Sequence, residues 1–149
     1  MRQYKSQLYK VSLTIISISS YIIIKLYIII YNEVIDMVTL STGLVIAGAY
    51  ADKLRRTLFA QLSDKVKSGE LDSKEVARAA AEVNQLLFNI LVEDLKIEKG
   101  DVVRIRIDYD VKDGEIKWDL STLSVEAFKR LEDEKVAEVV KKRVEELSK

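Results

Sequence analysis

The chain has 149 residues, which suits one packed domain, and its apolar content of 48% is enough for a core. Its 24 basic and 24 acidic side chains cancel, so no net charge draws the whole chain to a polyanion. Histidine and cysteine are absent, which excludes thiol and Ser-His catalysis, His or Cys metal centres, and disulfides. We therefore expect a non-enzymatic protein without a cofactor, a metal or a small-molecule substrate.

Residues 1–36 differ in composition from the rest of the chain. The segment Val11–Tyr31 is apolar and long enough to cross a bilayer. Residues 1–36 hold ten isoleucines and five of the seven tyrosines, yet no alanine or glycine. The abundant residue types of this segment have codons rich in A and T. This composition favours the interpretation that residues 1–36 are an upstream DNA region translated in frame, and that Met37 is the true start of the protein. The alternative that hydropathy leaves open is a membrane anchor.

The next elements are a strand and two helices. Residues 38–50 are β-branched and small and predict a strand that leads into a helix ending near Gly69. A second helix is expected from Asp72, its N-cap, to about Leu95. Glu75 has the spacing of a capping box, and Leu71 and Val76 have the spacing of a hydrophobic staple.

Residues 102–123 alternate in polarity on both sides of Asp113-Gly114, which predicts a hairpin with a two-residue turn. One face is apolar and aromatic, and the other carries Arg104, Arg106 and a cross-strand pair of Asp110 with Lys117. The pairs expected on the apolar face are Val111 with Ile116, Tyr109 with Trp118, and Ile107 with Leu120.

The last 22 residues, 128–149, predict a charged helix with a narrow apolar stripe that suits pairing between chains. The expected fold is α+β, with a small antiparallel sheet and its hairpin packed against two helices, in the order β-α-α-β-β-α. We divide the chain into 1–36 as a leader or extension, 37–128 as the functional domain, and 129–149 as a possible oligomerisation element.

Arg55 is a departure from the helical pattern around it. It projects between Leu58 and Val66, inside an apolar stripe, whereas Arg56 points away. A charged group facing a core needs a partner, so Arg55 either has an acidic mate or borders a partly open cleft.

The basic residues of the helix and the hairpin allow two interpretations: ordinary surface charge, or a groove whose cations contact the phosphate backbone of a nucleic acid. Tyr109 and Trp118 fit either a packed cross-strand pair or faces for stacked bases. Asp108, Asp110 and their neighbours resemble a magnesium site only weakly, because alternating carboxylates on a hairpin usually form local ion pairs.

The stretches STGLVIAGAYADKLRRTLFAQL, KGDVVRIRIDYD and GEIKWDL, with the capped helix between them, resemble the archaeal ThermoDBP-related family. The resemblance covers about residues 37–149. It implies a protein of thermophilic archaea whose α+β domain binds single-stranded DNA or RNA in a hydrophobic cleft edged by basic residues, usually as an oligomer.

We therefore expect a cytoplasmic, largely sequence-independent single-strand binder. The charge and the expected geometry of the side chains predict these contact residues: Lys53, Arg55, Arg56, Arg104, Arg106, Tyr109, Lys117 and Trp118. Two alternatives remain open: an oligomeric scaffold without nucleic-acid affinity, and a membrane-anchored domain, which requires that residues 1–36 be translated. A further hypothesis, an enzyme that acts on phosphate esters, is less favoured because the chain has no histidine.

Overall fold

The computed structural model describes residues 2–35 and 37–149, and within the first helix the side chains of residues 14–31. The chain divides into two compact units, Met1–Met37 and Val38–Lys149. The first unit is a single long helix, and the second contains the sheet with its helices.

Helix α1 (Arg2–Ile35) forms the first unit. Its segment Thr14–Tyr31 has a mean hydropathy of 1.9 and no buried residues, so by length and composition it could cross a membrane. The core helix of a soluble protein and a signal sequence near the N-terminus can have the same length and apolar composition. The interpretations of residues 1–36 as an upstream extension or as an anchor therefore both stay predictions.

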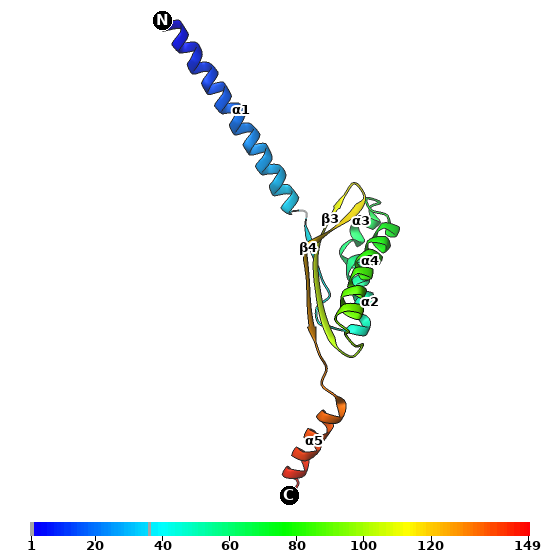
Figure 1. The fold of residues 1–149 in the computed structure, drawn as a ribbon. Coiled ribbons are helices and arrows are strands. Elements are labelled where there is room, and N and C mark those ends of the chain that lie inside the picture. The colour runs from blue at the N-terminus through cyan, green and yellow to red at the C-terminus, as the bar shows by residue number, and fades with distance from the viewer. Residues whose placement is uncertain (1, 36) are drawn as a thin grey trace. The chain divides into compact units, whose positions relative to one another are not determined.

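The second unit is built on an antiparallel sheet of four strands. Its central strand β3 (Val102–Lys112) pairs on one edge with β4 (Glu115–Phe128) and on the other with two short strands, β1 (Val38–Ser41) and β2 (Val45–Ile46). The predicted α+β fold with a hairpin packed on helices is thus confirmed (Figure 1).

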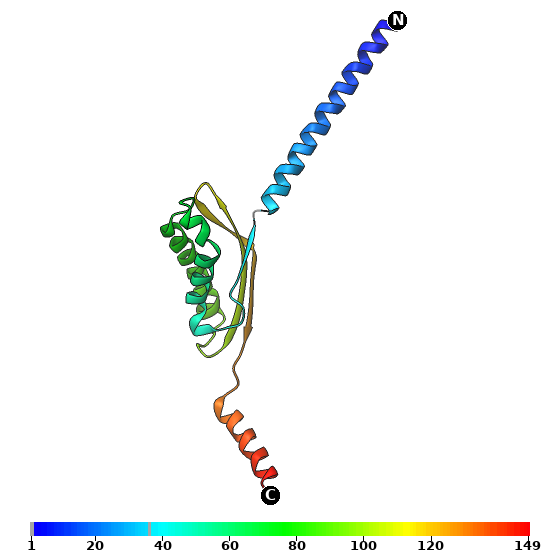
Figure 2. The same cartoon turned by 180° about the vertical axis from the view of Figure 1, so that it is seen from behind.

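Helices cover one face of this sheet. After a 3₁₀ turn, η1 (Ala47–Ala49), come α2 (Tyr50–Gln61), α3 (Ser63–Lys67) and α4 (Ser73–Phe88), and α4 continues as a π-helical segment, η2 (Asn89–Asp94). Both ribbon views show α2 and α4 on the same side of the sheet (Figures 1 and 2). The core lies between these layers. Its members include Leu54, Leu58, Val76, Val83, Leu87, Val103, Ile105 and Ile107, each at most 1% exposed.

The segment expected as one strand, residues 38–50, is two strands and a 3₁₀ turn. The break falls at Gly43, whose φ of +63° lies in the left-handed region that glycine tolerates. Thr42, next to it, is buried and makes two hydrogen bonds to Ile105 of β3. Its hydroxyl oxygen accepts a bond from the N–H of Ile105, and its own N–H donates to the carbonyl oxygen of Ile105, each over 3.0 Å. The chain thus changes direction without losing its backbone pairing.

The helix ends are partly as predicted. Asp72 caps α4, since its side chain accepts a hydrogen bond of 2.8 Å from the N–H of Lys74. Gly69, with φ +79°, follows α3, although the helix expected to run unbroken to it is interrupted at Leu62. The predicted capping box is wrong, because the Glu75 carboxylate bonds Arg78 and the N–H of Ile116 instead.

The hairpin turn is confirmed at Asp113 and Gly114, whose φ values of +53° and +73° suit a type I′ turn. Strand β4 runs five residues beyond the predicted end, to Phe128, and helix α5 (Asp133–Leu147) begins later than expected. Between them, the buried carboxylate of Asp101 accepts bonds from Lys129 Nζ at 2.8 Å and from the N–H of Arg130 at 2.9 Å. Asp101 therefore ties the segment before α5 to the loop before β3.

Candidate functional site

A groove of about 590 Å³ lies between α4 and the first half of β4. Apolar side chains line it, and charged side chains stand among them. The apolar group is Val83, Leu86, Ile116, Trp118 and Leu120, and the charged group is Arg78, Glu82, Glu115 and Lys117. A concave surface of this mixed kind is where a ligand with flat apolar parts and charged groups can bind. We call it the α4–β4 groove.

A β-bulge shapes one side of this groove. The register between β3 and β4 shifts between Arg106 and Asp108, where the partners change from Ser124 to Asp119. The predicted pair of Ile107 with Leu120 is therefore wrong: Ile107 is buried, whereas Leu120 is 59% exposed and lines the groove. Bulges next to binding sites commonly re-aim a side chain in this way.

Side chains inside the bulge replace the missing ladder bonds. The hydroxyl of Thr122 accepts a 2.8 Å bond from the N–H of Asp108 and donates one of 2.7 Å to the carbonyl of Asp119. Asp119 also accepts a 3.0 Å bond from the N–H of Ser121. The irregular segment is thus held by its own polar contacts, which fixes the place of Leu120.

Trp118 is half-buried and contributes its ring to the groove. Its Nε1 donates a hydrogen bond of 3.0 Å to the carbonyl oxygen of Ala79 on α4. Its ring meets that of Tyr109 edge to face, with centroids 5.5 Å apart. The predicted cross-strand pairs Tyr109 with Trp118 and Val111 with Ile116 are confirmed by the register.

Tyr109 differs from its neighbour because it is 0% exposed. Its hydroxyl donates to Gln61 Oε1 at 3.1 Å, and burial raises the pKa of the phenol to about 12. Tyr109 packs under Trp118 in the core and presents no ring face to a ligand in this conformation.

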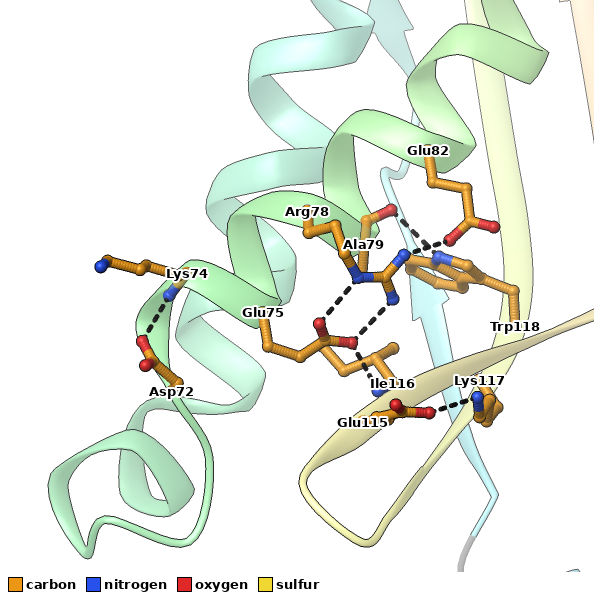
Figure 3. A network of polar contacts seen from close by, with 10 residues as sticks. All are labelled: Asp72, Lys74, Glu75, Arg78, Ala79, Glu82, Glu115, Ile116, Lys117 and Trp118. Carbon is orange, nitrogen blue, oxygen red and sulfur yellow. Dashed lines mark hydrogen bonds and ion pairs between the residues drawn. The ribbon is translucent and has the colours of Figure 1, made fainter.

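Arg78 projects from α4 at the groove and is held by two carboxylates (Figure 3). Its Nε and Nη2 each lie 2.7 Å from Glu75, and its Nη1 lies 3.0 Å from Glu82. Glu75 also accepts a 2.9 Å bond from the N–H of Ile116, which joins α4 to the hairpin. The guanidinium, followed by this N–H, lowers the pKa of Glu75 to about 2.

Lys117 stands on β4 at the opposite side of the groove and forms an ion pair with Glu115, which raises the pKa of its ammonium group. Asp110 faces it across the hairpin, as predicted, but is not its ion-pair partner. The carboxylate of Asp110 pairs instead with Lys112 at 3.3 Å. Both basic residues of the groove are therefore neutralised locally.

Arg104 and Arg106 lie on the other face of the sheet, away from the helices. Arg104 Nε is 3.3 Å from Glu126, its cross-strand neighbour, while Arg106 is exposed between Ser41 and Ser124 in the register. Arg104 and Arg106 are therefore separate from the α4–β4 groove, whereas Lys117, which was predicted on the same charged face of the hairpin, lines it.

Lys53, Arg55 and Arg56 are exposed on α2. Arg56 pairs with Asp52 at 2.8 Å, whereas the guanidinium of Arg55 lies over the ring of Phe59, 5.8 Å from its centroid. Among the described residues, no carboxylate pairs with Arg55. The charge of Arg55 therefore lies beside Phe59 on an exposed part of α2, and the partly open cleft expected next to it stays a prediction.

The eight predicted contact residues thus fall into three separate surface groups and one core position. Lys117 and Trp118 lie in the groove, Arg104 and Arg106 on the open sheet face, and three residues on α2. The groove also contains residues that were not among the predicted contacts: Arg78, Glu82, Leu86 and Leu120. The spacing of Glu75, Arg78 and Glu82 by three and four residues was an available signal for an ordered guanidinium on a helix.

Within residues 14–31 and 37–149, no three acidic side chains come together in a way that could hold an ion. Asp108 accepts a 2.6 Å bond from Thr39, and Asp119 is engaged in the bulge.

The fold and the groove define a small α+β domain with a one-sided antiparallel sheet and a tryptophan-lined groove at its helical side. Residues 40–117 match the model of a family described as ThermoDBP-related, archaea. The chain belongs to this ThermoDBP-related family of archaea.

Two solved structures are similar. The crystal structure of apeThermo-DBP-RP2 bound to ssDNA dT10 has 54% sequence identity and a TM-score of 0.71, over 73% of this chain and 50% of that one. The crystal structure of pfuThermo-DBP-RP1 has 38% identity and a TM-score of 0.57, over 74% of this chain and 71% of that one. This chain therefore spans about half the length of the first of them. No match to a curated protein was found.

Proposed function

We propose that this protein binds single-stranded DNA in the α4–β4 groove without marked sequence preference. The observation that carries the proposal is the half-buried ring of Trp118 beside Leu86 and Leu120, between Arg78 and Lys117. The 54% identity to a protein crystallised with dT10 supports the same ligand class.

The groove suits the two chemical parts of a single strand. Bases stack on Trp118 and contact the leucines, and such stacking contributes about 1–3 kcal/mol per base without distinguishing the bases. Phosphates approach the guanidinium of Arg78 and the ammonium of Lys117, which gives affinity that falls as salt rises.

RNA is proposed as a second ligand of the same groove. Stacking and phosphate contacts are common to both nucleic acids, and no side chain in the groove is arranged to select for or against a 2′-hydroxyl. We therefore expect comparable affinity for uridine and thymidine oligonucleotides.

We further infer that the protein acts as a homo-oligomer through α5. The apolar residues Val136, Val140, Val144 and Leu147 of this helix are between 44% and 90% exposed. A helical stripe of this kind is stabilised when a second helix covers it. The scaffold alternative uses the same stripe but predicts no nucleic-acid affinity.

Fluorescence anisotropy with labelled dT10, the matched RNA and a duplex, each across a salt series, tests this function. We expect salt-sensitive binding of both single strands and weaker binding of the duplex, whose stacked bases cannot reach Trp118. Arg78→Ala and Lys117→Ala should each weaken binding, whereas the double variant Arg104→Ala with Arg106→Ala, on the open sheet face, should change it less. Absence of binding at low salt would leave the scaffold as the better account.

A further inference from the structure

Each basic side chain of the α4–β4 groove already has an acidic partner within the groove. Arg78 Nη1 contacts Glu82 at 3.0 Å, and Lys117 pairs with Glu115 (Figure 3). These four side chains sum to zero charge. The unliganded groove therefore has little attraction for a phosphate group, although its cations are placed for one.

Glu75, the other carboxylate on Arg78, has a different role. Its side chain is 14% exposed and bonds two nitrogens of Arg78 as well as the N–H of Ile116. It fixes the guanidinium and the hairpin in place whether or not a ligand is present. Removing Glu82 would therefore leave Arg78 positioned.

Glu82 and Glu115 are held far more loosely. Their side chains are each 60% exposed, and each makes a single ion pair. Exposed ion pairs contribute little net stability, so either can be exchanged at small cost. A phosphate oxygen is an acceptor of the same charge and similar geometry as a carboxylate oxygen, and it forms the same charge-assisted bond to a guanidinium.

We propose that Glu82 and Glu115 occupy the phosphate sites of the free groove, and that a bound single strand replaces them with two of its own phosphates. This inference rests on the proposed function. The displaced carboxylates then lie free in solvent and attract cations, which offsets part of the counterion release from the strand. The pair therefore lowers both the affinity and its dependence on salt.

The test compares Glu82→Gln and Glu115→Gln with the wild-type full chain, using labelled dT10 in a salt series. Each variant should bind about two- to fivefold more tightly at low salt, since an exposed ion pair no longer has to be broken. The slope of log K against log salt should also steepen, because no displaced carboxylate then attracts cations from solution. The matched control is Glu126→Gln, which makes the same charge change beside Arg104 on the open sheet face.

The possible outcomes separate this inference from the function on which it rests. Tighter binding and a steeper slope in the groove variants, but not in Glu126→Gln, support the displacement. If wild-type binds and Arg78→Ala weakens it, but Glu82→Gln and Glu115→Gln are unchanged, weaker, or no different from Glu126→Gln, displacement is wrong and the function stands. If the wild-type chain binds no single strand, both are wrong. Thermal unfolding followed by circular dichroism confirms that each variant is folded.

Discussion

The indole Nε1 of Trp118 donates a hydrogen bond of 3.0 Å to the carbonyl oxygen of Ala79, which joins β4 to α4 across the α4–β4 groove. This bond holds the ring in one orientation, in an edge-to-face contact with the ring of Tyr109. Because Trp118 is the single tryptophan of the chain, its fluorescence reports on the groove alone.

Binding of an unlabelled thymidine oligonucleotide should quench this fluorescence, since a stacked base contacts the indole directly. We expect the quenching to saturate at the concentration at which anisotropy saturates. The double variant Arg104→Ala with Arg106→Ala should keep the signal, because both residues lie on the other sheet face. Binding seen by anisotropy without any change in tryptophan emission would place the strand elsewhere on the molecule.

Replacing Trp118 by phenylalanine separates stacking from the hydrogen bond. Trp118→Phe should lower the free energy of unfolding by about 1 kcal/mol, the net contribution of one hydrogen bond, while keeping part of the affinity. Trp118→Ala should lose about 1–3 kcal/mol of binding free energy for the base that stacks there. Urea denaturation and anisotropy measure the two effects, and equal affinities of the two variants would contradict a stacking role.

The acid limb of the stability curve should depend on Glu75. Its pKa falls from 4.5 to about 2 on folding, so the folded state favours the ionised carboxylate. The resulting stabilisation is fully present above pH 4.5 and is lost as the pH falls through about 2.

We expect Glu75→Gln to lower the free energy of unfolding at pH 7 by about 1.5–3 kcal/mol, the range for a hydrogen bond to a charged group. The difference from wild-type should shrink as the pH falls from 4.5 towards 2. Urea midpoints across this range measure it, with Glu115→Gln as the control at an exposed carboxylate of the same groove. A difference that stays constant with pH would show that Glu75 stabilises the fold by some means other than its charge.

Local chemistry explains which parts of the structure could be predicted. The cap at Asp72 and the turn at Asp113-Gly114 depend on contacts within a few residues. The position of this turn also determines the register that pairs Tyr109 with Trp118. The bulge could not be predicted, because it depends on Thr122 replacing a ladder bond to Asp108, fourteen residues away.

The candidate site was harder to predict for the same reason. Arg78 becomes part of the groove only because Glu75, expected to complete a capping box, binds both it and the N–H of Ile116. That choice between a local and a tertiary partner is decided by the position of the hairpin, which a single sequence does not reveal. Charge and periodicity found Lys117 and Trp118 but not the helix residues facing them.

The arginines of α2 provide a matched pair for the predicted contacts outside the groove. Arg55 has no carboxylate partner among the described residues, whereas Arg56 is engaged with Asp52 at 2.8 Å. We therefore expect Arg55→Ala to weaken binding of a long single strand more than Arg56→Ala, and to reduce the salt slope by about 0.7. Anisotropy with a long oligonucleotide measures both. Identical, unchanged affinities would remove α2 from the binding surface.

Asp101 should control how firmly the segment before α5 is held. Asp101 is 3% exposed. Its hydrogen bond from Lys129 makes the largest contribution to lowering the pKa of its carboxyl to about 2, and bonds from the N–H groups of Arg130 and Glu98 add to this effect. Asp101→Asn keeps the size of the side chain but removes its charge, so limited proteolysis between residues 129 and 132 should become faster. Asp133→Asn breaks only the exposed pair with Arg130 and should leave the cleavage rate close to that of wild-type. Equal rates in all three proteins would show that the segment is held without Asp101.

A single charge on the apolar stripe of α5 should dissociate the homo-oligomer that we propose, without unfolding the sheet domain. Val140 is 56% exposed and lies at the middle of the stripe, one turn from Val136 and one from Val144. In a helix pair, Val140→Glu would bury a carboxylate without a partner, which is strongly unfavourable. Light scattering coupled to size exclusion should therefore report a smaller species, while circular dichroism shows an unchanged thermal transition of the domain.

The control is Lys142→Glu, which makes a larger change of charge on the opposite face of the same helix and should leave the mass unchanged. A mass that is the same for both variants and wild-type, or that of a monomer in all three, would show that α5 does not join the chains.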